Sequence, residues 1–246
     1  MTEATEQQGY EISRVTDKLN KLQSVHKIIK IFGELRAEDM WRNTREVLNK
    51  YIRPDQKILD VGVGLGQTTK TFSEKLHLNQ KNIFSIDLGN VLMEESLKKG
   101  YSLAEGEKIP FEASTFDTTL FIDMLHHTKA PEELLLEGVR TTKQNGYIVL
   151  LENLLGDRWT DQKREKLYSF DNTWNSQSDG TNPHSNHTLS EWKKIGESLG
   201  LEFIESVEWQ WGKIDFVPGA TRIGDRKKPS KLRPFTDSIM IFRVKK

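Results

Sequence analysis

Three glycines stand in five positions directly after a short apolar run, in the stretch ILDVGVGLGQT that begins at Ile58. Glycine lets a backbone approach a ligand and adopt torsions that a Cβ atom disfavours. Twenty-one residues after Gly66, Asp87 ends a second apolar run. An acidic side chain at that distance in a doubly wound fold hydrogen-bonds the ribose hydroxyls of a nucleoside. The spacing of Gly62, Gly64, Gly66 and Asp87 therefore predicts a nucleoside site.

The same spacing indicates what the nucleoside lacks. A dinucleotide-binding loop of the GxGxxG type needs Gly or Ala three positions after its second glycine, so that the next helix can close around a pyrophosphate. Counted from Gly62 and Gly64, that position is Gln67. The loop is GxGxG instead, which favours a nucleoside without a pyrophosphate and disfavours a nicotinamide-dependent dehydrogenase.

A second group of candidate residues follows the fourth strand-like run, at Asp123, His126 and His127. Open α/β sheets bind their ligands beyond the carboxyl ends of the strands. A hydroxyl acceptor loses a proton during group transfer, and a His or a carboxylate most often takes it. We expect one of the two histidines to be this base; the alternative is that the pair only shapes the pocket. Glu152, after the fifth run, is either another candidate base or a cap on a backbone turn.

His184 and His187 lie three residues apart in a polar loop that also contains Asp179. Together they could form a divalent-cation site. A histidine pair at this spacing in a polar loop is more often a surface feature, so no metal is predicted.

Aromatic residues mark the segments that we expect to cover the acceptor. Aromatic faces pack well on sugar rings, quinones and polyketides. We expect substrate contacts from Trp159, Trp174, Trp209 and Trp211, whereas Trp192 lies on one face of an expected helix and is assigned to the core.

Lys and Arg gather in the loop 222–233, which includes Arg226. One interpretation is a solvated surface. The other is contact with an anionic acceptor, such as a phosphorylated or nucleotide-linked sugar, because guanidinium groups bind phosphate with paired hydrogen bonds. On the second interpretation Arg226 contacts the substrate.

These residues need elements that bring strand ends together. Short apolar runs alternate with helical ones, as in a parallel sheet with crossover helices. Seven strands are expected, at Lys57–Val61, Asn82–Ile86, Ser102–Ala104, Phe116–Ile122, Tyr147–Glu152, Glu202–Gln210 and Ser238–Val244. Helices are expected near Thr68–Lys75, Asn90–Lys98, Pro131–Arg140 and Leu189–Leu199. No convincing helix joins the last two strands, so the last strand should be antiparallel. The fold class is α/β: a Rossmann-like seven-stranded mixed sheet with helices on both faces.

The segments outside this alternation suggest a division of the chain. Residues 1–10 are expected to be a disordered tail, residues 11–55 an N-terminal helical cap, and residues 56–246 the catalytic domain. Two long polar segments, near 155–188 and 212–237, are expected to be insertions on the acceptor side. The N-terminal helix could close over the site or pair two copies into a homodimer.

The composition of the chain limits the kinds of partner that we expect it to bind. The chain of 246 residues has 36 basic and 36 acidic side chains and no cysteine. No global field favours nucleic acid, and disulfides and Cys-ligated zinc are excluded. No run approaches the roughly 20 apolar residues of a membrane span, and the start is no signal peptide, so a cytoplasmic location is expected.

Four ordered motifs resemble class I S-adenosylmethionine-dependent methyltransferases, small-molecule branch, which includes ubiquinone and menaquinone biosynthesis enzymes. ILDVGVGLG resembles the first motif and Asp87 the second. LAEGEKIPF and the FD…LHH pattern resemble the next two. The resemblance implies that Gly62, Gly64 and Gly66 bind the methionine part of the cofactor. It further implies cofactor contacts from Asp60, Asp87, Leu88, Glu105, Gly106 and Glu107, with Asp87 on the ribose and Glu105 and Gly106 beside the adenine.

The resemblance also implies the reaction. We expect in-line transfer of the methyl group of S-adenosylmethionine to a small molecule, leaving S-adenosylhomocysteine. O-methylation of a sugar, glycan or secondary metabolite, with a His or carboxylate base, is the leading hypothesis. The alternatives are C-methylation of a quinone-like acceptor and a binding module without catalysis. The sequence DMLHH stands where adenine-amino methyltransferases usually carry a PP-aromatic motif, so a nucleic-acid acceptor is disfavoured.

Overall fold

A single mixed sheet organises the computed structural model of the chain, which describes residues 31, 33–87, 101–103, 108–165, 168, 185–210 and 236–245. Its strands follow the order β3-β2-β1-β4-β5-β7-β6. Their bounds are β1 Ile58–Val61, β2 Ile83–Asp87, β3 Tyr101–Leu103, β4 Phe116–Ile122, β5 Thr142–Leu154, β6 Leu201–Trp209 and β7 Thr236–Val244.

One strand runs against the others. Pairing is parallel from β3 through β2, β1 and β4 to β5, whereas β7 is antiparallel to both of its neighbours, β5 and β6. The predicted Rossmann-like mixed α/β architecture, with an antiparallel last strand, is confirmed. The strand order reverses between β1 and β4, and ligands of open α/β sheets bind at such a switch point.

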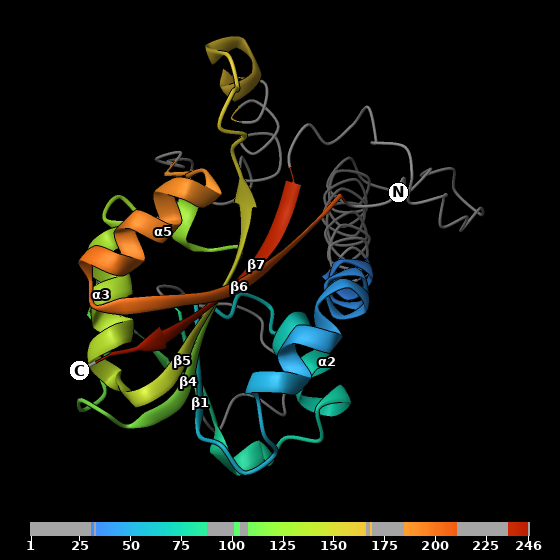
Figure 1. Ribbon diagram of the computed structural model, residues 1–246. Helices are drawn as coiled ribbons and strands as arrows, with labels where there is room; N and C mark the ends of the chain where they lie inside the picture. The colour runs from blue at the N-terminus through green and yellow to red at the C-terminus, as the bar shows by residue number, and fades with distance from the viewer. Residues whose placement is uncertain are drawn as a thin grey trace, which may run out of the picture.

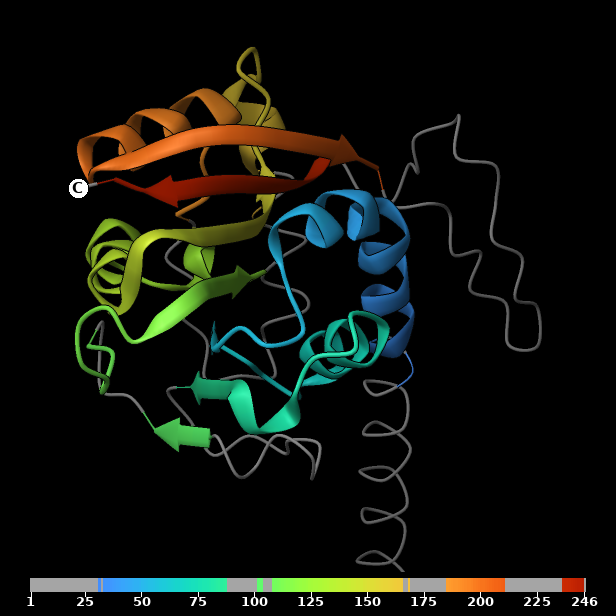
Figure 2. The same cartoon turned by 60° about the horizontal axis from the view of Figure 1, so that its bottom comes forward.

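Helices cover both faces of the sheet (Figure 1). On one face lie α3 (Pro131–Thr141) and α5 (Leu189–Ser198), which pack into a core with inward residues such as Phe121 and Phe242. On the other lie α2 (Gln67–Lys75) and a helix at 33–51, whose apolar side chains join Val149 and Ile241. Figure 2 shows the helix at 33–51 beside α2, on the same side of the sheet.

Local sequence explains where these helices begin and end. Thr188 and Glu191 form a reciprocal capping box at the start of α5. Such a box satisfies two backbone N–H groups that would otherwise lack partners. Pro131 occupies the first turn of α3, where its missing N–H costs nothing. Trp192 in α5 is 1% exposed, which confirms its prediction as a core residue.

The largest differences from the expected elements involve β5 and the segment after it. β5 begins at Thr142 rather than Tyr147, because polar residues continue the backbone pairing with β4 around a register shift. Asn145 adopts φ 60° inside this irregular part. The segment 155–188, expected to be an insertion outside the strand–helix alternation, contains a helical turn at 161–165 and an isolated bridge from Leu155 to Thr188. The expected helix Asn90–Lys98 lies outside the described residues.

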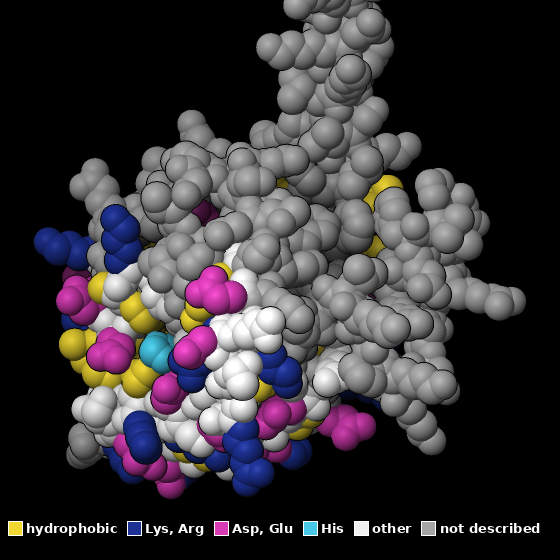
Figure 3. All heavy atoms as spheres, turned by 90° about the horizontal axis from the view of Figure 1, so that it is seen from above, with side chains coloured by type: hydrophobic (Ala, Val, Ile, Leu, Met, Phe, Trp, Pro, Cys, Tyr) yellow, Lys and Arg dark blue, Asp and Glu magenta, His cyan; other side chains and the backbone are white. Residues whose placement is uncertain are grey.

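The described surface is of mixed charge. Figure 3 shows acidic and basic side chains interspersed over the described part of one face, in line with the equal numbers of each in the chain. No helix among the described residues has the length and apolar character needed to cross a membrane.

Candidate active site

The glycine loop follows β1 and is folded back onto the end of β2. The backbone N–H of Gly62 donates to the Ile86 carbonyl at 2.9 Å, and the N–H of Gly64 donates to Asp87 Oδ2 at 2.8 Å. The expected nucleoside-binding residues of the two strands are therefore in direct contact.

Two of these glycines are required for different reasons. Gly62 has φ 76°, and a Cβ atom there would lie 2.8 Å from the Cβ of Met124, so the loop and the residue after β4 touch. Gly64 has φ 53°, yet a Cβ atom there would meet no atom of the described residues within 4 Å. Gly64 therefore presents an open stretch of backbone, which protein packing does not explain.

Asp60, the third of the four residues of β1, is a buried carboxyl group. Thr69 of α2 donates a hydrogen bond to its Oδ2, while the buried Oδ1 has no hydrogen-bond partner among the described residues. Burial raises the pKa of Asp60 to about 7, the Thr69 hydrogen bond opposes this shift, and the charge of Asp87 adds to it. A buried carboxyl oxygen without a partner costs stability, which is typical of a position kept for binding.

This shift predicts how stability changes with pH. Because the folded pKa of Asp60 lies above its ordinary value of 3.8, its contribution is fully present below about pH 4 and is lost as pH rises through about 7. Relative to Asp60→Asn, the wild-type free energy of unfolding should fall by up to about 4 kcal/mol between pH 4 and pH 8. Urea unfolding across this range measures the difference. The exposed Asp55→Asn variant should follow wild type, and parallel curves for Asp60→Asn and wild type would contradict the assignment.

A short turn at 123–127 carries the candidate base residues. Asp123 adopts φ 48°, an uncommon conformation for a residue with a side chain. Its N–H donates to the Leu151 carbonyl at 2.8 Å. The next residues, Met124 and Leu125, donate their N–H groups to Glu152 Oε1 at 3.1 and 2.8 Å. Glu152 thus caps the turn, as one of its two interpretations predicted.

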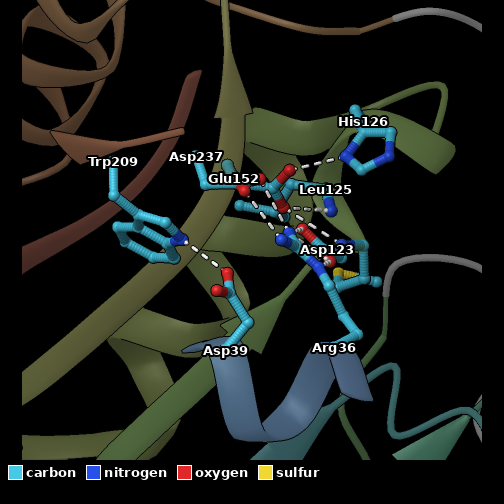
Figure 4. A network of polar contacts seen from close by, with 9 residues as sticks. Arg36, Asp39, Asp123, Leu125, His126, Glu152, Trp209 and Asp237 are labelled. Carbon is cyan, nitrogen blue, oxygen red and sulfur yellow. Dashed lines mark hydrogen bonds and ion pairs between the residues drawn. The ribbon is translucent and has the colours of Figure 1, made fainter. Parts of the chain in front are cut away.

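The other oxygen of Glu152 contacts a histidine. Oε2 lies 2.6 Å from His126 Nδ1, and both side chains are buried (Figure 4). Since Oε1 already accepts two backbone hydrogen bonds, the carboxylate is an acceptor, and Nδ1 carries the hydrogen. In that tautomer Nε2 bears the lone pair, which is the arrangement of a carboxylate-oriented base. The ring of exposed His127 lies 4.0 Å from that of His126, centroid to centroid.

Asp123 has a different partner. Its carboxylate accepts from Arg36 Nε at 3.1 Å and from Nη2 at 2.9 Å. Arg36 lies on the helix at 33–51 and also donates to both oxygens of Asp237, each at 2.7 Å. The structure therefore places Asp123 in an ion pair. Sequence reasoning missed Arg36, because no local pattern links it to a residue 87 positions away.

The expected acceptor-side aromatics are separated. Trp209 packs in the core between the sheet and the helix at 33–51, and its indole N–H donates to Asp39 Oδ2 at 3.2 Å. The structure thus gives Trp209 a packing position rather than an open aromatic surface. Trp159 lies beyond β5, partly buried in a small cluster with Leu155 and Tyr168.

Several expected site residues lie outside the described residues. They are the cofactor candidates Leu88, Glu105, Gly106 and Glu107 and the substrate candidates Trp174, Trp211 and Arg226. Of the histidine pair in the polar loop, only His187 is described. Burial lowers its pKa, and its ring packs edge-on against Trp192. Across the described ranges, no group of three or more His, Asp or Glu side chains could hold a metal ion.

Residues 59–150 match the sequence model of a protein family that is described as a methyltransferase domain. These residues run from β1 into β5 and include the glycine loop, Asp87 and the 123–127 turn. The chain carries a class I S-adenosylmethionine-dependent methyltransferase domain.

Three relatives of modest sequence identity are consistent with a methyltransferase domain. The methyltransferase is 28% identical over 219 residues to an uncharacterized methyltransferase of Schizosaccharomyces pombe, covering 81% of this chain and 76% of the relative. It is 27% identical over 177 residues to a ubiquinone/menaquinone biosynthesis C-methyltransferase of Burkholderia multivorans, covering 66% and 72%. It is 25% identical over 140 residues to an uncharacterized protein of Methanocaldococcus jannaschii, covering 54% of this chain and only 64% of that protein.

Solved structures share the fold. Phosphoethanolamine N-methyltransferase 2 of Haemonchus contortus, solved with S-adenosylhomocysteine, superposes with a TM-score of 0.56 at 17% identity and covers 83% of this chain and 53% of that one. The [4+2]-cyclase SpnF superposes with a TM-score of 0.57 at 13% identity, covering 83% and 80%. The second comparison shows that this fold alone does not define the reaction.

The residues present suit S-adenosylmethionine. Asp87 at the end of β2 provides acceptor oxygens for ribose hydroxyls. The bare backbone at Gly64 is open, and the buried Oδ1 of Asp60 has no hydrogen-bond partner among the described residues. An acidic and glycine-lined edge is appropriate for a nucleoside that carries a positive charge and no phosphate.

Proposed function

We propose that this methyltransferase transfers the methyl group of S-adenosylmethionine to an oxygen of a small molecule, with His126 as the general base. The observation that carries the proposal is the buried contact of 2.6 Å between His126 Nδ1 and Glu152 Oε2. His126 lies in the turn after β4, and Glu152 lies near the carboxyl end of β5, so the contact is at the same end of the sheet as the glycine loop.

The roles of the residues follow from this contact. When bound, S-adenosylmethionine supplies an electrophilic methyl group on a sulfonium. The acceptor hydroxyl would pass its proton to His126 Nε2 as its oxygen bonds to the methyl carbon and the carbon–sulfur bond breaks, leaving S-adenosylhomocysteine. Glu152 accepts from Nδ1, fixes the tautomer and stabilises the imidazolium that forms. The same carboxylate holds the turn in place, so ring orientation and turn geometry depend on one side chain.

The acceptor class is the finer part of the proposal. We favour a sugar, glycan or secondary metabolite, with Trp159, Trp174 and Trp211 on its apolar face and Arg226 on an anionic group. Hydrophobic and aromatic linings with a few polar contacts are usual for such molecules. This proposal also includes the division of the chain into a helical cap, a catalytic domain and two acceptor-side insertions. It further includes a homodimer that forms through the N-terminal helix.

A second candidate reaction is C-methylation of a quinone-like acceptor. It is supported by the likeness to the Burkholderia C-methyltransferase over 72% of that protein. A reduced quinone also has a hydroxyl whose deprotonation would activate the neighbouring carbon, so the same base would serve. Only the atom that receives the methyl group distinguishes the two reactions.

The test is a screen with methyl-labelled S-adenosylmethionine against sugars, phenols and reduced quinones. We expect label in at least one hydroxylated acceptor, and NMR of the product should show a methyl ether. A C-methyl product would favour the second candidate. Tight binding of S-adenosylhomocysteine without transfer to any acceptor would contradict both and favour a binding module. Reactions without acceptor give the background.

A further inference from the structure

Arg36 lies outside residues 59–150, which match the methyltransferase family, yet all three nitrogens of its guanidinium group donate hydrogen bonds to carboxylates. Its Nε and Nη2 donate to Asp123, while Nη1 and Nη2 donate to Asp237. Both edges of the planar guanidinium are thus used in paired hydrogen bonds. A lysine, with a single charged nitrogen, cannot reproduce this pattern.

The two carboxylates come from strands that are not neighbours. Asp123 follows β4, and Asp237 is the second residue of β7, whereas β5 lies between these strands in the sheet. Arg36 therefore bridges the end of β5 from the helix at 33–51 (Figure 4). Its side chain is 11% exposed, and that of Asp237 is 3% exposed. Burial alone would lower the pKa of Arg36, but the charges of both carboxylates raise it above its ordinary value.

The turn at 123–127 is consequently held from both faces of the sheet. Alternate residues of a strand point to opposite faces. In β5, Leu151 packs with the helix at 33–51, whereas Leu150 and Leu154 pack with α3 and α5, so Glu152 belongs to the α3 side. In β7, Ile239 and Ile241 face the helix at 33–51, as does Asp237 by alternation. Arg36 thus holds the first residue of the turn on one face, while Glu152 holds His126 on the other.

The strain in the turn makes this support necessary. A residue with a side chain at φ 48° is strained, and such a conformation persists only where surrounding contacts fix it. Asp123 has this conformation two residues before the buried Leu125 and three before His126. Loss of its ion pair would let the turn relax, and the His126 ring would move relative to Glu152.

We propose that Arg36 is a positioning residue, which holds the 123–127 turn in the geometry that brings His126 to Glu152. Its consequence for methyl transfer rests on the proposed role of His126 as base.

A second ion pair on the same helix provides a matched control. Lys50 contacts Glu205 of β6 at 3.0 Å, and the Lys50 side chain is 57% exposed. This pair also joins the helix to the sheet but touches no residue of the turn. If Arg36 only anchored the helix, Lys50→Met should resemble Arg36→Lys, apart from the smaller contribution expected of an exposed pair.

The test reads the His126 ring directly. The chain has six histidines, so ¹⁵N-imidazole labelling of the full chain gives a tractable spectrum, assigned with His126→Gln. We expect wild type to show protonated Nδ1 at His126 and Lys50→Met to retain that signal. Arg36→Lys should lose it or show mixed tautomers. Asp123→Asn leaves Arg36 paired with Asp237 and should also lose the protonated Nδ1 signal of His126 or show mixed tautomers. This variant replaces Arg36→Lys in the test if Arg36→Lys fails to fold.

The kinetic counterpart uses the acceptor found in the screen. We expect Arg36→Lys to lower kcat about tenfold while the Kd of S-adenosylhomocysteine changes less than about twofold. An unchanged His126 signal in both folded turn variants, or the same loss of signal in Lys50→Met, would overturn the proposal. The NMR spectrum requires no turnover, so the positioning role of Arg36 can be tested separately from the role of His126 as base. Full activity of a His126→Ala variant would refute the base assignment and would leave the NMR result for Arg36 unchanged.

Discussion

Replacement of His126 by Ala is expected to lower kcat by about 100-fold or more, while the Kd of S-adenosylhomocysteine changes less than about twofold. General base catalysis by a positioned side chain contributes about 10² to 10⁴ in rate. The imidazole is 2% exposed and is oriented through Nδ1 by Glu152, so its removal takes away a positioned base. Radiolabelled methyl transfer at saturating acceptor measures kcat, and calorimetry measures affinity.

Two further variants make this test specific. His77→Asn changes an exposed histidine just after α2, on the connection that leads to the start of β2 rather than at the strand ends near His126, and should retain wild-type rates. His127→Ala removes the exposed neighbour and should cost less than tenfold. If His127→Ala abolished transfer and His126→Ala did not, the base would be His127, and Glu152 would serve only as the cap of the turn.

Gly64→Ala is expected to weaken binding of S-adenosylhomocysteine by at least about tenfold. In the protein alone, the added Cβ atom meets no atom of the described residues within 4 Å, so only the φ of 53° opposes it. That strain costs of order 1 kcal/mol of stability. The larger loss should come from overlap with the cofactor, because we expect the methionine part to lie against this open backbone.

Gly200→Ala is the matched control for Gly64→Ala. Gly200 has φ 83°, and a Cβ atom there also meets no atom of the described residues within 4 Å, but it stands between α5 and β6, remote from the glycine loop. Both variants should therefore lose similar stability in urea unfolding, and only Gly64→Ala should lose affinity in calorimetry. Equal affinities in the two variants would show that the cofactor does not use the open face at Gly64.

The features that the sequence predicted best are those with short-range causes. β4 has the predicted bounds, because an apolar run between polar turns determines it. The glycine loop and Asp87 were found from spacing alone, and the structure joins them through the Gly64 N–H. The start of β5 was missed because backbone pairing with β4 extends the strand into polar residues.

The features that sequence reasoning could not find depend on contacts between distant segments. Arg36 and Asp237 are 201 positions apart, and nothing near either residue indicates their pairing. Trp209 resembled a substrate-facing aromatic because sequence shows that it lies near the end of an expected strand, but does not show which helix covers it. The double role of Glu152 follows from its two oxygens facing different groups, which only coordinates reveal.

The reversed direction of β7 has a consequence for how such enzymes can diversify. Trp209 ends β6 opposite Asp237, and Thr236 begins β7 opposite Leu154 near the end of β5. The connection between β6 and β7 therefore leaves from and returns to the edge where the candidate base lies. If the acceptor binds beside the candidate base as proposed, a segment inserted or exchanged at these two attachment points would change what borders it without altering strand order or core. Evolution, and equally a protein engineer, could thus retarget this enzyme by grafting a single connection whose two attachment points are already fixed.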